Sequence, residues 1–245
     1  MDSTDPAIEP FLRDVLVPVS AGWNIRVSDR ALHQFALYAA ELVRWNERVN
    51  LTRITAPGDI VVRHFLDSLA CARAFGSMPP SLIDVGTGAG FPGLPLKIIW
   101  PTMRLVLSDS IGKKTAFLRH LVQALELEDV EVVTTRAEDL GRDPAHREQY
   151  AGVVARAVAD LAVLGEYCLP LCRVGGRFVA PKGANGAEEA EGAERVLGLL
   201  GGRLREVLPV ELPDLPRRTL VVVEKERATP AGLPRPTGVP AKQPL

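Results

Sequence analysis

The stretch Leu82-Ile83-Asp84-Val85-Gly86-Thr87-Gly88-Ala89-Gly90-Phe91-Pro92-Gly93 decides the fold class of this chain. A short apolar run enters a glycine-rich turn, and a second apolar run further along ends at Ser108-Asp109-Ser110. A strand, a glycine turn, a helix and a second strand that ends on an acid are typical of a nucleotide-binding βαβ unit. The acid can accept hydrogen bonds from two ribose hydroxyls. The stretch therefore predicts a ligand with an adenosine-like ribose.

Two details of this stretch favour S-adenosylmethionine over NAD as the ligand. Residues 88–93 match the dinucleotide pattern GxGxxG, which is weak evidence on its own. Asp84 precedes the first glycine by two residues, and the segment D-V-G-T-G-A-G resembles motif I of class I methyltransferases. Pro92 and Pro95 remove amides from the first turn of the next helix, and a diphosphate would need those amides whereas a sulfonium would not. An NAD(P)-dependent oxidoreductase stays as the alternative.

Composition restricts the class of protein. The 245 residues have a net charge of −1, so any site for a polyanion must be local. No apolar run is long enough for a transmembrane helix, and the acidic amino terminus lacks the apolar core flanked by basic residues of a signal peptide. We expect a cytoplasmic protein with no membrane partner, and we expect it to be a monomer. The cysteines and histidines show neither CxxC nor HxxxH spacing, which predicts no metal site. They are Cys71, Cys168, Cys172, His33, His64, His120 and His146.

The chain divides into three expected parts. Residues 1–78 predict a helical extension, in which Ser28 caps an amphipathic helix to about residue 50 and a second helix covers about 57–75. Residues 79–227 alternate strands and helices, which predicts an α/β, Rossmann-like domain with a mostly parallel seven-stranded sheet and helices on both faces. Residues 228–245 are rich in proline and basic, and predict a disordered tail.

The expected strands and helices of the middle part alternate along the chain until its last two strands. We expect those two strands to be antiparallel at the edge of the sheet. The expected strands are 82–85, 104–108, 130–134, 152–155, 177–180, 203–210 and 219–224. The expected helices include 113–125, 161–171 and 187–200.

Several motifs, taken in order, resemble one known family. They are W-N-E-R-V-N-L-T-R-I at 45–54, R-H-F-L-D-S-L at 63–69, the glycine stretch, D-S at 109–110, K-K at 113–114, F-L at 117–118, R-A-E at 136–138, A-R-A at 155–157, G-G at 175–176 and P-K-G at 181–183. Together they cover roughly residues 40–225 and resemble the bacterial small-subunit rRNA guanine-N7 methyltransferase family, also called glucose-inhibited division protein B.

The resemblance implies a class I methyltransferase that moves a methyl group from S-adenosylmethionine to N7 of one guanine, position 527, of 16S rRNA in the small ribosomal subunit. N7 carries an in-plane lone pair and no proton at neutral pH, so this reaction needs no general base. Positioning of the reactants can supply about 7–11 kcal/mol of the barrier. Residues 154–158 contain neither the D/N-P-P-Y/F motif of exocyclic amine methyltransferases nor a cysteine nucleophile for cytosine C5. A non-catalytic RNA-binding module is a further alternative.

The candidate cofactor residues follow expected strands, at the edge where open α/β sheets bind ligands. They are Gly86, Gly88, Gly90, Phe91, Asp109, Ser110, Ala137, Glu138 and Arg156. The glycines would let the cofactor approach, and Phe91 would close over it unless it is a core residue. Asp109 or Ser110 would meet the ribose, while Ala137 and Glu138 would border the adenine.

Arg156 is also the candidate catalytic residue, through positioning of cofactor or substrate. Its guanidinium can hold the methionine carboxylate or an RNA phosphate, and the alternative is a structural ion pair. His64 and Asp67 are three residues apart on an expected helix and so share a face. The candidate RNA-binding residues are Lys113, Lys114, Arg136, Lys182, Arg63 and His64. Since N7 lies in a deep groove of A-form RNA, the guanine must lie in a loop or swing out of the stack.

Overall fold

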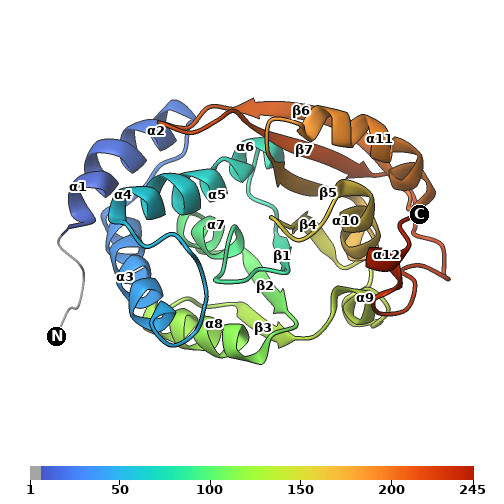
Figure 1. The fold of residues 1–245 in the computed structure, drawn as a ribbon, viewed down its shortest axis with the longest axis horizontal. Helices are drawn as coiled ribbons and strands as arrows, with labels where there is room; N and C mark the ends of the chain where they lie inside the picture. Colours follow the sequence, from blue (N-terminus) through green and yellow to red (C-terminus); the bar gives the residue numbers. More distant parts are fainter. Residues whose placement is uncertain (1–6) are drawn as a thin grey trace.

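A seven-stranded sheet forms the centre of the computed structural model, which describes residues 7–245 (Figure 1). The strands lie in the order β3-β2-β1-β4-β5-β7-β6. The first five strands are parallel, and β7 runs antiparallel to both of its neighbours. This confirms the mostly parallel α/β sheet and the antiparallel last pair. The strands are β1 (Ser81–Val85), β2 (Arg104–Asp109), β3 (Val130–Thr134), β4 (Tyr150–Val154), β5 (Cys172–Lys182), β6 (Gly202–Val210) and β7 (Arg218–Lys225).

Helices cover both faces of this sheet (Figure 1). Among residues 7–245, no helix is both long enough and apolar enough to cross a membrane. The α-helices before β1 are α1 (Glu9–Phe11), α2 (Val17–Gly22), α3 (Asp29–Asn46), α4 (Pro57–Asp59), α5 (Asp67–Leu69) and α6 (Cys71–Phe75), with π-helical turns at Leu12–Leu16 and Ile60–Leu66. The others are α7 (Gly93–Ile99), α8 (Gly112–Ala124), α9 (Ala137–Leu140), α10 (Leu161–Cys168), α11 (Gly186–Leu199) and α12 (Val239–Lys242).

The buried strands place successive side chains in two different cores. Leu82 belongs to the core beneath α3, α7 and α8, whereas its neighbour Ile83 belongs to the core beneath α10 and α11. The same alternation separates Leu107 from Val106. Because successive side chains of a strand point to opposite faces, a continuous apolar run can fill both cores at once. The sheet is therefore covered on both sides, and its open edge at the strand ends is left for ligands.

The helical extension shares the first of these cores with the sheet. Ser28 caps α3, as predicted, since its side chain accepts a hydrogen bond from the amide of Ala31. Gln34 of α3 donates to the carbonyl of Leu125 (2.7 Å), and Tyr38 donates to the carbonyl of Ala89 in the glycine turn (2.6 Å). The extension thus supports the glycine turn directly. The bounds of the three parts stay a prediction.

The prediction of a disordered tail is wrong, because residues 228–245 are docked on the protein. The tail lies beside α9 and α10 (Figure 1). Arg147 donates to the carbonyls of Thr229 and Leu233, and Arg142 donates to that of Pro234. Proline removes a backbone donor and leaves its carbonyl available, so side-chain donors from the body of the protein can hold a proline-rich segment in place.

Candidate active site

Asp84 organises the glycine turn that follows β1. Its Oδ2 atom accepts hydrogen bonds from the Thr87 hydroxyl (2.6 Å) and from the amide of Gly93 (2.7 Å). Burial raises the pKa of this carboxyl to about 6, and the two hydrogen bonds oppose that rise. Gly90 has a φ of 101°, and a Cβ there would lie 2.5 Å from Leu94 and 2.6 Å from the Tyr38 hydroxyl. Only glycine can take this position without strain.

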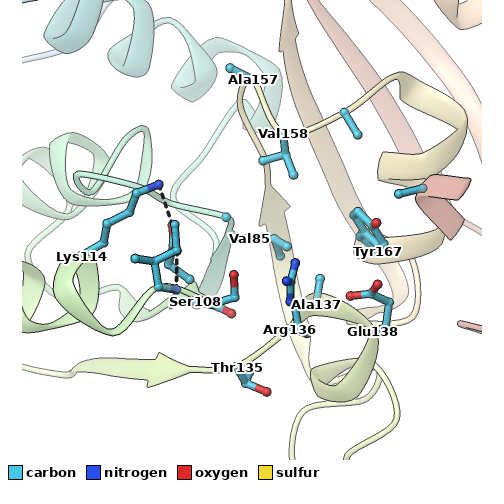
Figure 2. A pocket seen from close by; sticks show the side chains of 16 residues that line it. Val85, Ser108, Lys114, Thr135, Arg136, Ala137, Glu138, Ala157, Val158 and Tyr167 are labelled. Atoms are coloured by element: carbon cyan, nitrogen blue, oxygen red, sulfur yellow. Dashed lines mark hydrogen bonds and ion pairs between the residues drawn. The ribbon is translucent and has the colours of Figure 1, made fainter. Parts of the chain in front are cut away.

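A cavity of about 390 Å³ lies at the carboxyl ends of β1 and β2, and we call it the β1–β2 pocket (Figure 2). Its volume is within the range of small-molecule sites. The sheet order reverses between β1 and β4, which is where open α/β sheets bind ligands. The lining residues are Val85, Gly86, Ser108, Asp109, Ser110, Ile111, Lys114, Thr135, Arg136, Ala137, Glu138, Ala157, Val158, Ala159, Tyr167 and Ala241.

Asp109 is the acidic group at the end of β2 in this pocket. Its Oδ2 atom accepts from the amide of Gly88 (3.0 Å), and its Oδ1 atom accepts from the amide of Ile111 (2.9 Å). The ammonium of Lys114 lies 3.7 Å from Oδ2. The carboxylate is 6% exposed, and each oxygen keeps a lone pair after these bonds. Asp109 therefore joins the glycine turn to α8 and can still accept from a ligand.

The opposite wall of the pocket comes from α9, α10 and the tail. Figure 2 shows Lys114 on one side and Ala137, Glu138 and Tyr167 on the other. Glu138 is 4% exposed, and its Oε1 atom accepts from the amide of Gly238 (2.8 Å). Glu138, which we predict to border the adenine, therefore also holds the tail through a hydrogen bond.

A second cavity, of about 340 Å³, lies next to the first and is lined by several cationic side chains. We call it the arginine pocket. Four of its side chains are cationic and one is a carboxylate, and Ala157 lines both this pocket and the β1–β2 pocket. Ala157 has a φ of 56°, a conformation that side-chain-bearing residues rarely adopt and that concentrates at functional sites. The lining residues are Ile54, Arg63, His64, Asp67, Arg156, Ala157, Pro181, Lys182, Gly183 and Arg218.

Arg156, directly after β4, is tied to the helical extension. Its Nη1 atom lies 2.7 Å from Asp67 Oδ2 and also donates to the carbonyl of Arg63 (3.1 Å). Its Nη2 atom lies 3.3 Å from His64 Nδ1. Contacts to both His64 and Asp67 confirm that these two residues share a helix face. The ion pair with Asp67 is the alternative that the sequence left open for Arg156.

Phe91 packs beneath this cluster and lines neither pocket. Its ring stacks on His64 with 4.3 Å between ring centroids, and on Tyr38 with 5.1 Å between centroids. The guanidinium carbon of Arg156 lies 5.2 Å from the centre of the same ring. Phe91 is 4% exposed, so it occupies the core position that was its alternative. Stacked rings of this kind hold their polar edges in a fixed direction.

His64 is neutral in this arrangement, because both of its ring nitrogens have fixed partners. A guanidinium only donates, so Nδ1 accepts from Arg156, and Nε2 carries the proton that faces the Thr52 hydroxyl (2.9 Å). Burial, together with the nearby charge of Arg156, lowers the pKa of His64 to about 3. A second proton would have to enter at Nδ1, directly against the guanidinium.

This predicts a pH-dependent loss of stability that belongs to His64. Between pH 6.5 and about 3 the unfolded chain binds a proton that the folded protein does not, so stability falls as the pH falls through that window. From about pH 7 to about pH 5 we expect wild type to lose about 2 kcal/mol more unfolding free energy than His64→Gln. Denaturant titrations at both pH values measure this difference. The raised pKa of Asp84 makes stability rise as the pH falls, but this contribution is the same in wild type and in His64→Gln. Equal losses of unfolding free energy in the two proteins would mean that His64 takes up a proton in the folded state.

Two findings from known proteins identify the chain. Residues 31–216 match the family GidB, described as rRNA small subunit methyltransferase G. The chain is 56% identical over 232 residues to the ribosomal RNA small subunit methyltransferase G of Roseiflexus sp. (strain RS-1), covering 95% of this chain and 99% of that protein. The chain belongs to this family. A second relative of the same name, from Chloroflexus aggregans, is 47% identical and covers 94% of this chain and 97% of its own length.

Membership of the rRNA small subunit methyltransferase G family settles the class of cofactor and enzyme. The protein is an S-adenosylmethionine-dependent methyltransferase, as the glycine stretch predicted, and the oxidoreductase alternative is not supported. Solved structures show the same fold at low identity. Cofactor-bound Rv0187 from MTB has a TM-score of 0.58 at 20% identity, covering 86% of this chain and 98% of that one. TrmN from Thermus thermophilus has a TM-score of 0.53 at 20% identity, covering 77% and 53%.

Within this family member, the predicted site residues fall into distinct places. Five of the cofactor candidates line the β1–β2 pocket, together with two of the RNA candidates: Gly86, Asp109, Ser110, Ala137 and Glu138, with Lys114 and Arg136. Four other candidates line the arginine pocket: Arg63, His64, Arg156 and Lys182. Gly88 contacts Asp109 from outside the lining, Gly90 lies against Tyr38, and Lys113 is exposed on α8. The roles of these residues stay predictions.

Sequence reasoning missed several residues of the two pockets. Tyr167 and Ala241 line the β1–β2 pocket, and Arg218 lines the arginine pocket. Tyr167 lies inside an expected helix and Ala241 in the expected disordered tail, so neither gave a local signal. Arg218 begins β7 next to β5, and only the strand order brings it near Lys182.

Proposed function

We propose that this enzyme methylates N7 of a single guanine, position 527, of 16S rRNA in the small ribosomal subunit. The observation that supports this most is the pair of pockets that meet at Ala157, one with an acid for a ribose and one rich in cations for a polyanion. The family description and the names of the relatives refer to ribosomal RNA of the small subunit. We also infer that the protein is a monomer and works in the cytoplasm.

The residues of the β1–β2 pocket fit the adenosine half of S-adenosylmethionine. Asp109 supplies a buried carboxylate that can accept from ribose hydroxyls, and Ile111, Val158 and Ala137 supply apolar surface for a flat base. Gly86 lets the backbone after β1 lie close to Val158, because a Cβ at this position would be only 2.6 Å from the Val158 side chain. The bound cofactor supplies an electrophilic methyl group on its sulfonium.

The arginine pocket fits the guanine nucleotide that receives the methyl group. Arg63, Arg156, Lys182 and Arg218 place positive charge where an RNA phosphate can bind, and such contacts make affinity fall with salt. Lys182 is held in place by Glu189 (2.7 Å) and by the carbonyl of Ala159 (2.9 Å). The charges orient the nucleotide rather than activate it, since N7 already presents its lone pair and loses no proton.

Ala157 defines the passage between the two sites in this proposal. It lines both pockets and follows Arg156, whose guanidinium is fixed by Asp67 and His64. A rigid Arg156 therefore fixes the backbone of Ala157, where the methyl donor and the guanine that accepts the methyl group would meet. The chain needs to align N7 with the methyl carbon and to exclude water, which is catalysis by positioning.

The first test is methyl transfer from labelled S-adenosylmethionine to small-subunit RNA that lacks its N7-methylguanosine. Free 16S rRNA and whole small subunits are assayed side by side, and the nucleosides are analysed after digestion. We expect one new N7-methylguanosine per RNA and none when guanine 527 is replaced by adenine. Label on another atom, or no label in either substrate despite cofactor binding, would refute the proposed acceptor and leave the enzyme class unchanged.

A further inference from the structure

The docked tail reaches the cofactor side of the protein, beyond the residues that the family model matches. The match ends at residue 216, whereas Ala241 of α12 lines the β1–β2 pocket. Figure 1 shows α12 beside α9 and α10, the two helices that carry Glu138 and Tyr167. We call Pro234–Lys242 the C-terminal strap.

Buried and half-buried charges hold the strap in a fixed position. The amide of Arg235 and its guanidinium both donate to Glu166 of α10, with Nη2 2.7 Å from Oε2. The Glu166 side chain is 1% exposed and that of Arg235 is 22% exposed, so the carboxylate of this bidentate pair is shielded from water while the guanidinium stays partly open to it. The hydroxyl of Thr237 donates to Asp139 (2.8 Å). These bonds fix the segment that leads into α12.

Glu138 connects the strap to the pocket itself. It lines the β1–β2 pocket, and its Oε1 atom accepts from the amide of Gly238, one residue before α12. Ala241 then faces the same cavity as Ala137 and Tyr167. Asp109, which fits the ribose, lies at the end of β2, while Ala137 begins α9 and Ala241 lies on α12, so these two residues line the part of the pocket that would face the base.

We propose that the C-terminal strap is a cofactor-binding element that closes the β1–β2 pocket over the adenine end of S-adenosylmethionine. This inference rests on the proposed assignment of that pocket to the cofactor. Glu138 acts as a positioning residue, because it holds the strap against the base. Cofactor binding and strap docking then stabilise each other. By linkage, the free energy by which bound cofactor stabilises strap docking equals the free energy by which the docked strap strengthens cofactor binding.

The test is thiol labelling of the full chain at two neighbouring positions. Cys71, Cys168 and Cys172 are buried, so a cysteine introduced at an exposed position reacts selectively with a maleimide. Ala241→Cys reports on the pocket wall, and Gln243→Cys is the matched exposed control two residues away. Calorimetry with S-adenosylhomocysteine first establishes the Kd of each variant, so that labelling is measured at known saturation.

At about 100 times the Kd of S-adenosylhomocysteine, we expect labelling at position 241 to slow by about tenfold or more, and labelling at position 243 to change by less than about twofold. Equal rates with and without ligand at position 241 would overturn the proposal. The Asp109→Ala variant separates the two claims. If Asp109→Ala binds S-adenosylhomocysteine as wild type does, the assignment of the pocket to the cofactor is wrong. If Asp109→Ala loses binding, but the ligand does not protect Ala241→Cys in a chain that keeps Asp109, only the proposal for the strap is wrong.

A second variant tests the strap through kinetics. Arg235→Ala removes the clamp on Glu166, and we expect the KM for S-adenosylmethionine to rise about tenfold while kcat at saturating cofactor stays within about twofold. A purely structural role would lower the melting temperature and leave the KM unchanged, which would contradict the proposal. Labelling of Ala241→Cys carries the test if Arg235→Ala does not fold.

Discussion

Replacing Arg156 with alanine is expected to slow methyl transfer about 100-fold and to lower the unfolding free energy by about 3 kcal/mol. The loss of stability follows from the ion pair, because the Asp67 side chain is 7% exposed and loses its 2.7 Å partner. Arg218, 3.7 Å from the other Asp67 oxygen, keeps part of the compensation. The loss of activity follows from the position of Arg156 beside Ala157, where both pockets meet.

Single-turnover methylation and denaturant unfolding measure the two effects separately. Arg177→Ala is the control, since Arg177 also holds the fold together, by donating to the carbonyls of Ala74 and Phe75. It should lose stability and keep its activity. Arg156→Lys retains the charge but not the planar fork, and we expect it to recover only part of the rate. A folded Arg156→Ala variant with nearly wild-type turnover would reduce Arg156 to a structural ion pair.

The β1–β2 pocket was largely predictable because it is assembled from the ends of strands. Gly86 follows the buried strand β1, Asp109 ends the buried strand β2, and Ala137 comes shortly after the half-buried strand β3. Parallel strands bring their carboxyl ends to one edge of the sheet. The local sequence around each residue contains this information. The switch point between β1 and β4 follows from the same pattern once the glycine stretch marks the first strand.

The arginine pocket was less predictable because its contacts join distant parts of the chain. Arg156 pairs with Asp67, 89 residues earlier, and no periodicity connects the two. The ring stack of Tyr38, Phe91 and His64 likewise joins α3, the glycine turn and the π-helical turn. The three-residue spacing predicts that His64 and Asp67 share a helix face, but such a spacing rule cannot predict their contacts with residues elsewhere in the chain.

The tail shows how composition can mislead. Its prolines rule out a regular helix or strand over most of its length, and a composition of this kind predicts disorder. Order here comes instead from Arg142, Arg147 and Glu166, which belong to the body of the protein and bind the tail through its backbone and Arg235. A segment that lacks its own secondary structure can therefore be ordered by partners that its own sequence does not show.

Replacing Asp109 with alanine is expected to weaken S-adenosylhomocysteine binding by about 100-fold or more. Hydrogen bonds to a carboxylate contribute about 1.5–3 kcal/mol each, and two ribose hydroxyls would lose this acceptor. The amides of Gly88 and Ile111 also lose the oxygens that hold the glycine turn beside α8. Calorimetry measures the affinity, and the melting temperature of the unliganded variant reports on the turn.

Ser110→Ala is the matched comparison, because the sequence left Asp109 and Ser110 as alternative partners of the ribose. Both line the β1–β2 pocket, but Ser110 is exposed whereas Asp109 is 6% exposed and fixed by two amides. A fixed, charged acceptor loses less entropy on binding and forms the stronger bond, so Ser110→Ala should weaken binding by less than about threefold. If Ser110→Ala has the larger effect, the ribose lies further out, and Asp109 serves only to join the glycine turn to α8.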